Sequence, residues 1–201
     1  MGNTISTPKT TLRPDSPDSG ASAYYHFDCS ISEIDTLKLS GLIPHAFDEF
    51  IASLPQKMQL RRGAFILAHG GSPVSDSTLS VIAISDGATS CSGLGITIPR
   101  SKSMIQEICD ARCLKTVVPA SDFHGNFVER HALIVSPDGC LGMYPLEVNT
   151  LILGAVALNC DNYEAFQDSS SEIQSALGAL GQRVAELAPV QSSDAPTSLD
   201  N

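Results

Sequence analysis

The sequence predicts an α+β fold in which helices cover an antiparallel sheet. Apolar residues at helical spacing occur near both ends of the chain, and several apolar runs of strand length lie between them. Turn-forming residues such as Asp138-Gly139 and Glu147-Val148-Asn149 separate these runs. Runs of strands flanked by helices are typical of a sheet that packs against helices in layers.

Composition and charge limit the classes of protein that this chain can represent. Its 201 residues suffice for one domain of ordinary size, and the hydrophobic content of 42% indicates a globular core. The 12 Lys and Arg against 22 Asp and Glu give a formal net charge of −10, which argues against an autonomous nucleic-acid binder. The apolar run at 151–158 is far shorter than the roughly 20 residues that span a membrane, so we expect no stable membrane insertion.

Both ends of the chain differ in composition from its middle. Residues 1–28 are rich in Ser, Thr and Pro and predict a flexible tail, and residues 189–201 predict a second one. Residues 29–188 form the predicted domain. The first six residues match the N-myristoylation pattern at Gly2, and whether this glycine is acylated is left open. No apolar segment of a secretory signal follows, so we expect a cytoplasmic location.

The first predicted element is a helix. Ser30-Ile31-Ser32-Glu33 matches a capping box, and apolar residues at helical spacing continue to Leu54. Residues 41–44 contain Gly41 and Pro44 and predict a break in this helix.

Two strands, a short helix and a third strand are expected next. The apolar runs at 64–68 and 79–84 predict strands, joined by a turn-rich loop that begins at His69-Gly70-Gly71-Ser72-Pro73. Residues 101–111 place apolar side chains at helical spacing. Residues 114–118 predict the short strand that follows.

Three further strands and a closing helix complete the predicted domain. The strands are expected at 132–135, 141–146 and 151–158. The helix is expected at 171–187, with a narrow apolar seam made by Ile173, Leu177, Leu180, Val184 and Leu187. We expect this seam to pack on the sheet, which leaves the first helix as the surface through which a homodimer could form.

The six cysteines do not form the pattern of a disulfide framework or a zinc site. A chain of this length buries its own core without disulfides. No CxxC pair occurs, and the pair Cys109 and Cys113 has no matching Cys or His pair downstream at zinc-site spacing. We therefore expect buried thiols in a reducing compartment. The cysteines are Cys29, Cys91, Cys109, Cys113, Cys140 and Cys160.

Four segments of the chain together resemble the GAF domain, a small-molecule-binding module of signalling proteins. They are similar to the family's glycine-containing loop and short helix, its strand-to-loop step ending in Asp, its strand ending in Pro-Leu and the glycine-containing strand after it. The resemblance implies a GAF-like antiparallel sheet with flanking helices. The segments are residues 92–111, 115–122, 141–146 and 153–158, followed by Phe166 and the helix at 171–187.

A narrower resemblance exists to the GAF domains of nitric-oxide-responsive transcription activators. Pro99-Arg100 opens the short helix as it does in that family, and Cys140 stands where a cysteine helps to hold a non-haem iron. Asn126 and Asn159 stand where the family has two further Asp ligands. Because asparagine is neutral and a poorer iron ligand than a carboxylate, we expect the iron site to be lost and assign no metal. The cofactor is left unknown.

The segment Asp122–His131 is interpreted as a loop, and it is the densest polar and aromatic stretch of the domain. Loops on this side cover the ligand pocket in GAF folds, so the resemblance implies ligand contacts here. His124 and His131 either contact a ligand or are solvated loop residues.

Two other features remain open in their roles. Glu129-Arg130 is expected to be a surface pair of little energetic weight. Tyr144 either offers its hydroxyl group to a pocket or fills the core. The candidate ligand-binding residues are Asp122, His124, Asn126, Arg130, Cys140, Tyr144 and Asn159.

The function expected from these features is that of a stand-alone GAF-like sensory or regulatory protein, not an enzyme. It would bind a small ligand or sense redox state through a thiol, and it would signal through a partner protein because the chain has no room for an output domain. A non-catalytic adaptor on a degenerate GAF scaffold is the alternative, favoured by the missing carboxylates and the tails. A thiol-dependent sulfoxide reductase is a further alternative, because some GAF-like enzymes reduce free methionine sulfoxide with cysteines.

Overall fold

The structure, a computed structural model, describes residues 33–68, 78–87, 90–93, 96–148 and 151–187. Both predicted tails lie outside the described residues, and so do Ser30 of the expected capping box and the loop that begins at His69. The boundaries of the domain therefore remain a prediction.

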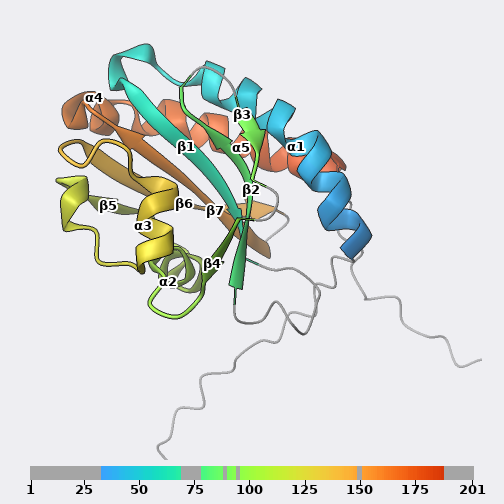
Figure 1. The fold of residues 1–201 in the computed structure, drawn as a ribbon. Coiled ribbons are helices and arrows are strands. Elements are labelled where there is room, and N and C mark those ends of the chain that lie inside the picture. Colours follow the sequence, from blue (N-terminus) through green and yellow to red (C-terminus); the bar gives the residue numbers. More distant parts are fainter. Residues whose placement is uncertain (1–32, 69–77, 88–89, 94–95, 149–150, 188–201) are drawn as a thin grey trace, which may run out of the picture.

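One antiparallel sheet runs through the middle of the fold, as expected (Figure 1). Its strand order is β3-β2-β1-β7-β6-β5, and β4 pairs with β2. The neighbouring strands pair in antiparallel register throughout. The strands are β1 Leu60–Leu67, β2 Thr78–Ser85, β3 Ser90–Ser92, β4 Thr97–Pro99, β5 Lys115–Val117, β6 Cys140–Val148 and β7 Leu151–Cys160.

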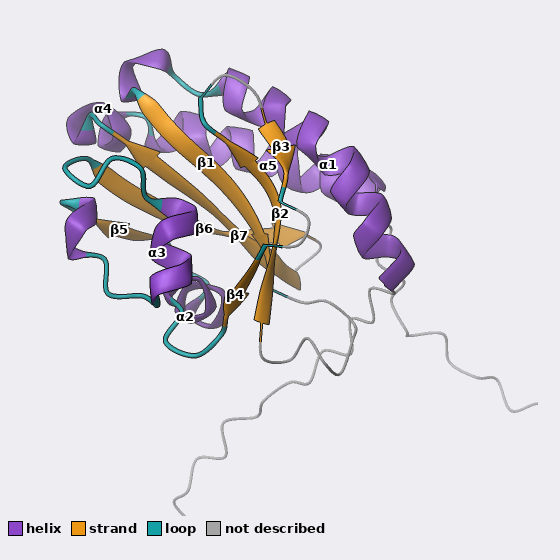
Figure 2. Cartoon of the chain, in the orientation of Figure 1, coloured by secondary structure: helices purple, strands orange, loops and turns teal. Residues whose placement is uncertain are grey.

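Helices cover both faces of this sheet (Figure 2). The long helices α1 and α5 lie on one face, and the short helices α2 and α3 lie on the other. The helices are α1 Glu33–Ser53, α2 Met104–Ala111, α3 Phe127–Leu133, α4 Tyr163–Asp168 and α5 Ser170–Leu187, with 3-10 turns η1 Gln56–Met58 and η3 Ala120–Asp122.

The central strands are buried on both faces because their side chains alternate between two apolar layers. Val156 and Leu158 of β7 pack into the layer beneath α1, α4 and α5. Ala155 and Ala157 of the same strand pack into the layer beneath α2 and α3. We call these the α1–α5 layer and the α2–α3 layer.

The predicted break at residues 41–44 is wrong, since α1 continues through Pro44. A proline inside a helix removes one backbone hydrogen bond and crowds the preceding turn. Ile43, Phe47 and Phe50 nevertheless lie on one buried face that spans the proline. Burial of that face against the sheet outweighs the local cost.

The predicted strand at 132–135 is also wrong. Ala132 and Leu133 are the buried last residues of α3, and Val135 is exposed beyond the helix end. Arg62 of β1 donates from Nη1 to the carbonyl oxygens of His131 and Ala132, each at 3.3 Å, which caps the carboxyl end of the helix. Four apolar residues are too few to distinguish a strand from a helix end.

The remaining expected elements are present, and five short ones were not expected. The seam of α5 packs within the chain as expected, because Ile173, Leu177, Leu180 and Val184 are buried in the α1–α5 layer. The unexpected elements are η1, β3, β4, η3 and α4. In the part of the chain that the structure describes, no helix has the length and apolarity needed to cross a membrane.

The close approach of β7 to β1 gives the first testable prediction. A Cβ atom on Gly154 would overlap the backbone carbonyl oxygen of Ile66, and backbone in the centre of a sheet cannot move aside. We expect Gly154→Ala to lower the free energy of unfolding by at least about 1–3 kcal/mol, measured by denaturant titration.

Gly178→Ala in α5 is the matched control, because nothing lies within 4 Å of the added Cβ position. Alanine favours helix over glycine, so this variant should gain about 0.5–1 kcal/mol. Equal stability of the two variants would contradict the described packing.

Candidate functional site

The structure divides the seven candidate ligand-binding residues between the two faces of the sheet. Five belong to the α2–α3 side, where the segment around η3 and α3 meets β7. Cys140 and Tyr144 point the other way, into the α1–α5 layer. The five are Asp122, His124, Asn126, Arg130 and Asn159, so the candidates do not converge on one pocket.

The segment Asp122–His131 is mostly helical rather than a loop, and its polar residues serve the local fold. Asn126 is the N-cap of α3: its side chain accepts from the Glu129 backbone N–H at 2.9 Å and donates to the Pro99 carbonyl oxygen at 2.8 Å. Arg130 donates to the carbonyl oxygens of Ser121 at 3.0 Å and Phe123 at 3.4 Å. Asp122 and His124 are exposed.

The residue that sequence reasoning missed is Glu129. It is completely buried, so the expectation of a surface pair with Arg130 is wrong for Glu129. Its carboxylate accepts hydrogen bonds from the Ser103 hydroxyl at 2.8 Å, the Met104 N–H at 3.0 Å and the Ile105 N–H at 2.8 Å. The signal was present in the sequence, because glutamate three residues after an N-cap asparagine faces back along its helix.

Glu129 thus joins α3 to the amino end of α2. The unpaired backbone N–H groups and the helix dipole make that end favourable for an anion. Burial raises the pKa of the Glu129 carboxyl group, and the hydrogen bonds from Ile105, Ser103 and Met104 oppose that rise. We call the Glu129 carboxylate with its three donors the Glu129 joint.

A half-buried arginine lies close to the Glu129 joint. Arg100 precedes α2, and its guanidinium group donates to Gln106 Oε1 at 2.5 Å and to the carbonyl oxygen of Ala68 at the end of β1. It thereby ties α2 to the end of β1. The predicted Pro99-Arg100 entry to the short helix is therefore a structural feature of this chain.

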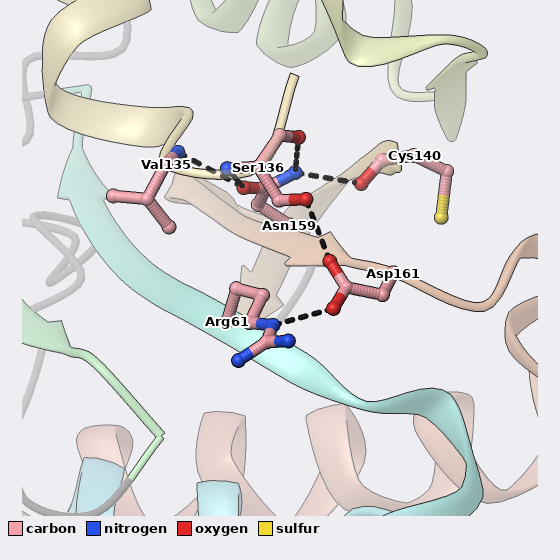
Figure 3. Close-up of polar contacts among 6 residues, drawn as sticks. All are labelled: Arg61, Val135, Ser136, Cys140, Asn159 and Asp161. Atoms are coloured by element: carbon pink, nitrogen blue, oxygen red, sulfur yellow. Dashed lines mark hydrogen bonds and ion pairs between the residues drawn. The ribbon is translucent and has the colours of Figure 1, made fainter. Parts of the chain in front are cut away.

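Asn159 holds the ends of β6 and β7 together (Figure 3). Its Oδ1 accepts from the backbone N–H groups of Val135 at 3.0 Å and Ser136 at 2.7 Å. Its Nδ2 donates to the carbonyl oxygens of Ser136 and Cys140, each at 3.0 Å. A buried amide that satisfies four backbone groups is a structural clamp, because each group left unpaired would cost about 1–3 kcal/mol.

An ion pair extends this clamp to β1. The Ser136 hydroxyl donates to Asp161 Oδ1 at 2.6 Å, and Arg61 Nε donates to Asp161 Oδ2 at 2.5 Å. These contacts from Ser136 and then Arg61 lower the pKa of the Asp161 carboxyl group. We call Asn159, Ser136, Asp161 and Arg61 the Asn159 clamp.

Cys140 and Cys160 face each other across β6 and β7. They are directly paired residues of the antiparallel ladder, and both thiols are free and fully buried. The side-chain contact between the two thiols lowers the pKa of Cys140 and raises the pKa of Cys160. The buried Tyr144 hydroxyl, which has no hydrogen-bond partner within the described residues, interacts electrostatically with both.

Cys109 and His131 do not add to either site. Cys109 of α2 is buried, and burial raises the pKa of its thiol to about 12. His131 is exposed, with its ring 4.3 Å from the ring of Phe127. Among the described residues, no group of three or more His, Cys, Asp or Glu lies close enough together to hold a metal ion.

The raised pKa of Glu129 gives a pH-dependent prediction. A carboxyl group that binds its proton more tightly in the folded state stabilises the fold at low pH, and this contribution is lost as pH rises through the folded pKa. We expect the difference in unfolding free energy, wild type minus Glu129→Gln, to fall as pH rises from the ordinary glutamate range through the raised pKa, and then to level off. Denaturant titrations across pH measure this difference.

Glu172→Gln on the exposed surface of α5 controls for the loss of one negative charge. A wild-type advantage over Glu129→Gln that grows with rising pH would contradict the assigned direction of the shift.

Comparisons with known proteins identify the fold. No family model matches the sequence, and no curated protein matches it. Among solved structures, the GAF domain of a two-component sensor histidine kinase from Bacillus halodurans is similar, with a TM-score of 0.50 and 18% identity over 80% of this chain and 95% of that one. The type II free methionine-R-sulfoxide reductase from Thermoplasma acidophilum is also similar, with a TM-score of 0.51 and 13% identity over 77% of this chain and 94% of that one.

At such identities the likeness concerns the fold, and the narrower resemblance to nitric-oxide-responsive activators stays a prediction. The chain has the fold of a GAF domain.

Proposed function

We propose that this chain is a sensory or regulatory protein without catalytic activity, which binds a small molecule at the α2–α3 side of its sheet and relays that event to a protein partner. The GAF fold supports the general role, since the similar domain from Bacillus halodurans belongs to a sensor histidine kinase. The choice of side rests on this chain's own residues.

The observation that carries the proposal is the Glu129 joint. A fully buried carboxylate in an otherwise apolar layer is costly, and its cost is reduced mainly by the three donors at the start of α2, with a further contribution from the Asn126 backbone. Titratable groups with perturbed pKa values concentrate at functional sites. A ligand that competes for these donors, or that brings a charge near Glu129, would shift α2 relative to α3.

The lengths of the helices favour a response on this side. Helix α2 has 8 residues and α3 has 7, whereas α1 has 21 and α5 has 18 on the opposite face. Short helices gain little stability from their own backbone and depend on their tertiary contacts. The α2–α3 side therefore depends on tertiary contacts such as the Glu129 joint, which a bound small molecule could alter.

The exposed residues Asp122 and His124 are the proposed ligand contacts, because they precede α3 in the chain and are not committed to it as Asn126 and Arg130 are. A short connection, residues 123–126, joins η3 to α3, so a ligand bound by either residue would act on the start of the helix that carries Glu129. Redox sensing through a thiol is a second input, which Cys140 and Cys160 support.

The likeness to a methionine sulfoxide reductase makes a thiol enzyme the competing function. The three buried cysteines give it little support. The raised pKa of Cys109 leaves its thiol almost entirely protonated at neutral pH, and Cys140 and Cys160 lie on the opposite face of the sheet. Reduction of free methionine-R-sulfoxide by the purified chain would overturn the non-catalytic proposal.

A thermal-shift screen of the full chain tests ligand binding. The panel contains nucleotides, amino acids and divalent cations, each at millimolar concentration. A ligand present at 100 times its Kd contributes about 2.7 kcal/mol, which for a domain of this size raises Tm by roughly 5–10 °C. We expect at least one compound to give such a shift, and His124→Ala to reduce it.

His45→Ala is the matched control, because His45 lies on the exposed surface of α1 with its side chain 80% accessible. This variant should keep the full ligand-induced shift. Failure of every compound in the panel would count against ligand binding and favour the adaptor alternative, which a pull-down with the intact chain then examines.

A further inference from the structure

The opposed thiols of Cys140 and Cys160 form a second feature that ligand binding at the α2–α3 side does not use. Cys140 is the first residue of β6 and Cys160 is the last residue of β7. Directly opposed residues of antiparallel strands have Cα atoms about 4.5–5.5 Å apart. A disulfide requires a Cα separation of about 4.4–6.8 Å, so the backbone already lies within the range that a bond needs.

The Asn159 clamp maintains that separation. Asn159 immediately precedes Cys160 and binds the carbonyl oxygen of Cys140, so one side chain joins the backbone of the two cysteine positions. Gly139, next to Cys140, packs so closely on the Cys160 carbonyl oxygen that a Cβ atom there would overlap it. The two strand ends are held together by contacts that do not involve sulfur.

The surroundings of the thiols are unusual for a purely apolar core. Cys140, Gly142 and Tyr144 lie on the same face of β6, and the Phe166 ring of α4 fills the space above Gly142. The Tyr144 hydroxyl near the thiols is buried and has no hydrogen-bond partner within the described residues. A buried unpaired hydroxyl group is costly, and an apolar ring would fill this volume without that cost.

We propose that Cys140 and Cys160 are a reversible dithiol–disulfide pair, oxidised by a hydroperoxide and reduced by thiols, through which the chain senses redox state. The inference stands apart from ligand binding at the α2–α3 side, because the pair lies on the opposite face of β6 and β7.

The chemistry balances with hydrogen peroxide as the oxidant. The Cys140 thiolate attacks one peroxide oxygen, an S–O bond forms, the O–O bond breaks, and the departing hydroxide takes up the proton that Cys140 lost to become water. The Cys160 sulfur then attacks the Cys140 sulfur, an S–S bond forms, and the S–O bond breaks. The sulfenic oxygen leaves with the Cys160 proton as a second water, so two electrons pass from the thiols to the peroxide.

The order of events follows from the difference between the two thiols. Their side-chain contact lowers the pKa of Cys140 and raises that of Cys160, so Cys140 is the attacking group and Cys160 resolves the sulfenic acid. Because both sulfurs are buried, the oxidant reaches them through local opening at the strand ends. The six-residue helix α4, which places Phe166 over this site, is the short element whose opening would admit it.

Peptide mapping of the full chain after oxidation tests the pair. The chain carries Cys29→Ser, Cys91→Ser and Cys113→Ser, so that the exposed thiols of Cys91 and Cys113, and Cys29 outside the described residues, cannot exchange. It is treated with hydrogen peroxide, unfolded, alkylated and digested. We expect one cross-linked peptide pair joining Cys140 to Cys160, with a mass lower by two hydrogen atoms, which dithiothreitol converts back to two alkylatable thiols.

Cys109 is the internal control, because it is a buried thiol whose pKa is raised to about 12. It should remain alkylated throughout. Alkylation of Cys140 and Cys160 to the same extent as Cys109 would overturn the proposal, and so would irreversible oxidation of Cys140 without a cross-link.

Removal of one thiol distinguishes a redox pair from two packing residues. In the Cys160→Ser variant, oxidation of Cys140 should stop at the sulfenic acid, which dimedone traps. The Cys109→Ser variant should still form the Cys140–Cys160 cross-link in full. If Cys160→Ser fails to fold by circular dichroism, the result on the chain that retains both thiols still decides the question.

Discussion

The interaction on which the rest of the structure depends is the buried amide of Asn159. The two longest strands, β6 and β7, are covered on both faces, so their ends must satisfy polar backbone groups where the ladder stops. Asn159 does so with all four of its hydrogen bonds, and Asp161 connects the same point to β1 through Arg61. The centre of the sheet is therefore held by directional contacts as well as by apolar packing.

This arrangement separates the two faces of the sheet in their physical properties. On the α1–α5 side, long helices bury aromatic and aliphatic side chains over Cys140, Tyr144 and Cys160. On the α2–α3 side, two short helices meet through the Glu129 joint. A small molecule and an oxidant would thus act on opposite faces of the same pair of strands, which gives one domain two independent inputs.

The sequence predicted the fold class and most elements, because periodic apolar residues report burial directly. It failed where a contact distant in sequence overrides the local pattern. Pro44 is tolerated because its helix has a continuous buried face. Residues 132–133 end helix α3, and Arg62 of β1 caps that end. Asn126 and Asn159 were named as candidate ligand-binding residues, but the structure commits their amides to backbone groups.

The candidate site was less accessible to prediction for the same reason. Nothing local indicates that Glu129 reaches across to Ser103, or that Cys140 and Cys160, 20 positions apart in the chain, are paired in register. The central claim is that the α2–α3 side opens readily while the centre of β7 stays closed, and native-state hydrogen exchange of the reduced full chain measures it directly. We expect the Met104 and Ile105 amides, bound to Glu129, to exchange through openings of clearly lower free energy than the Val156 and Leu158 amides of β7. Equal opening free energies for both sets would contradict the claim.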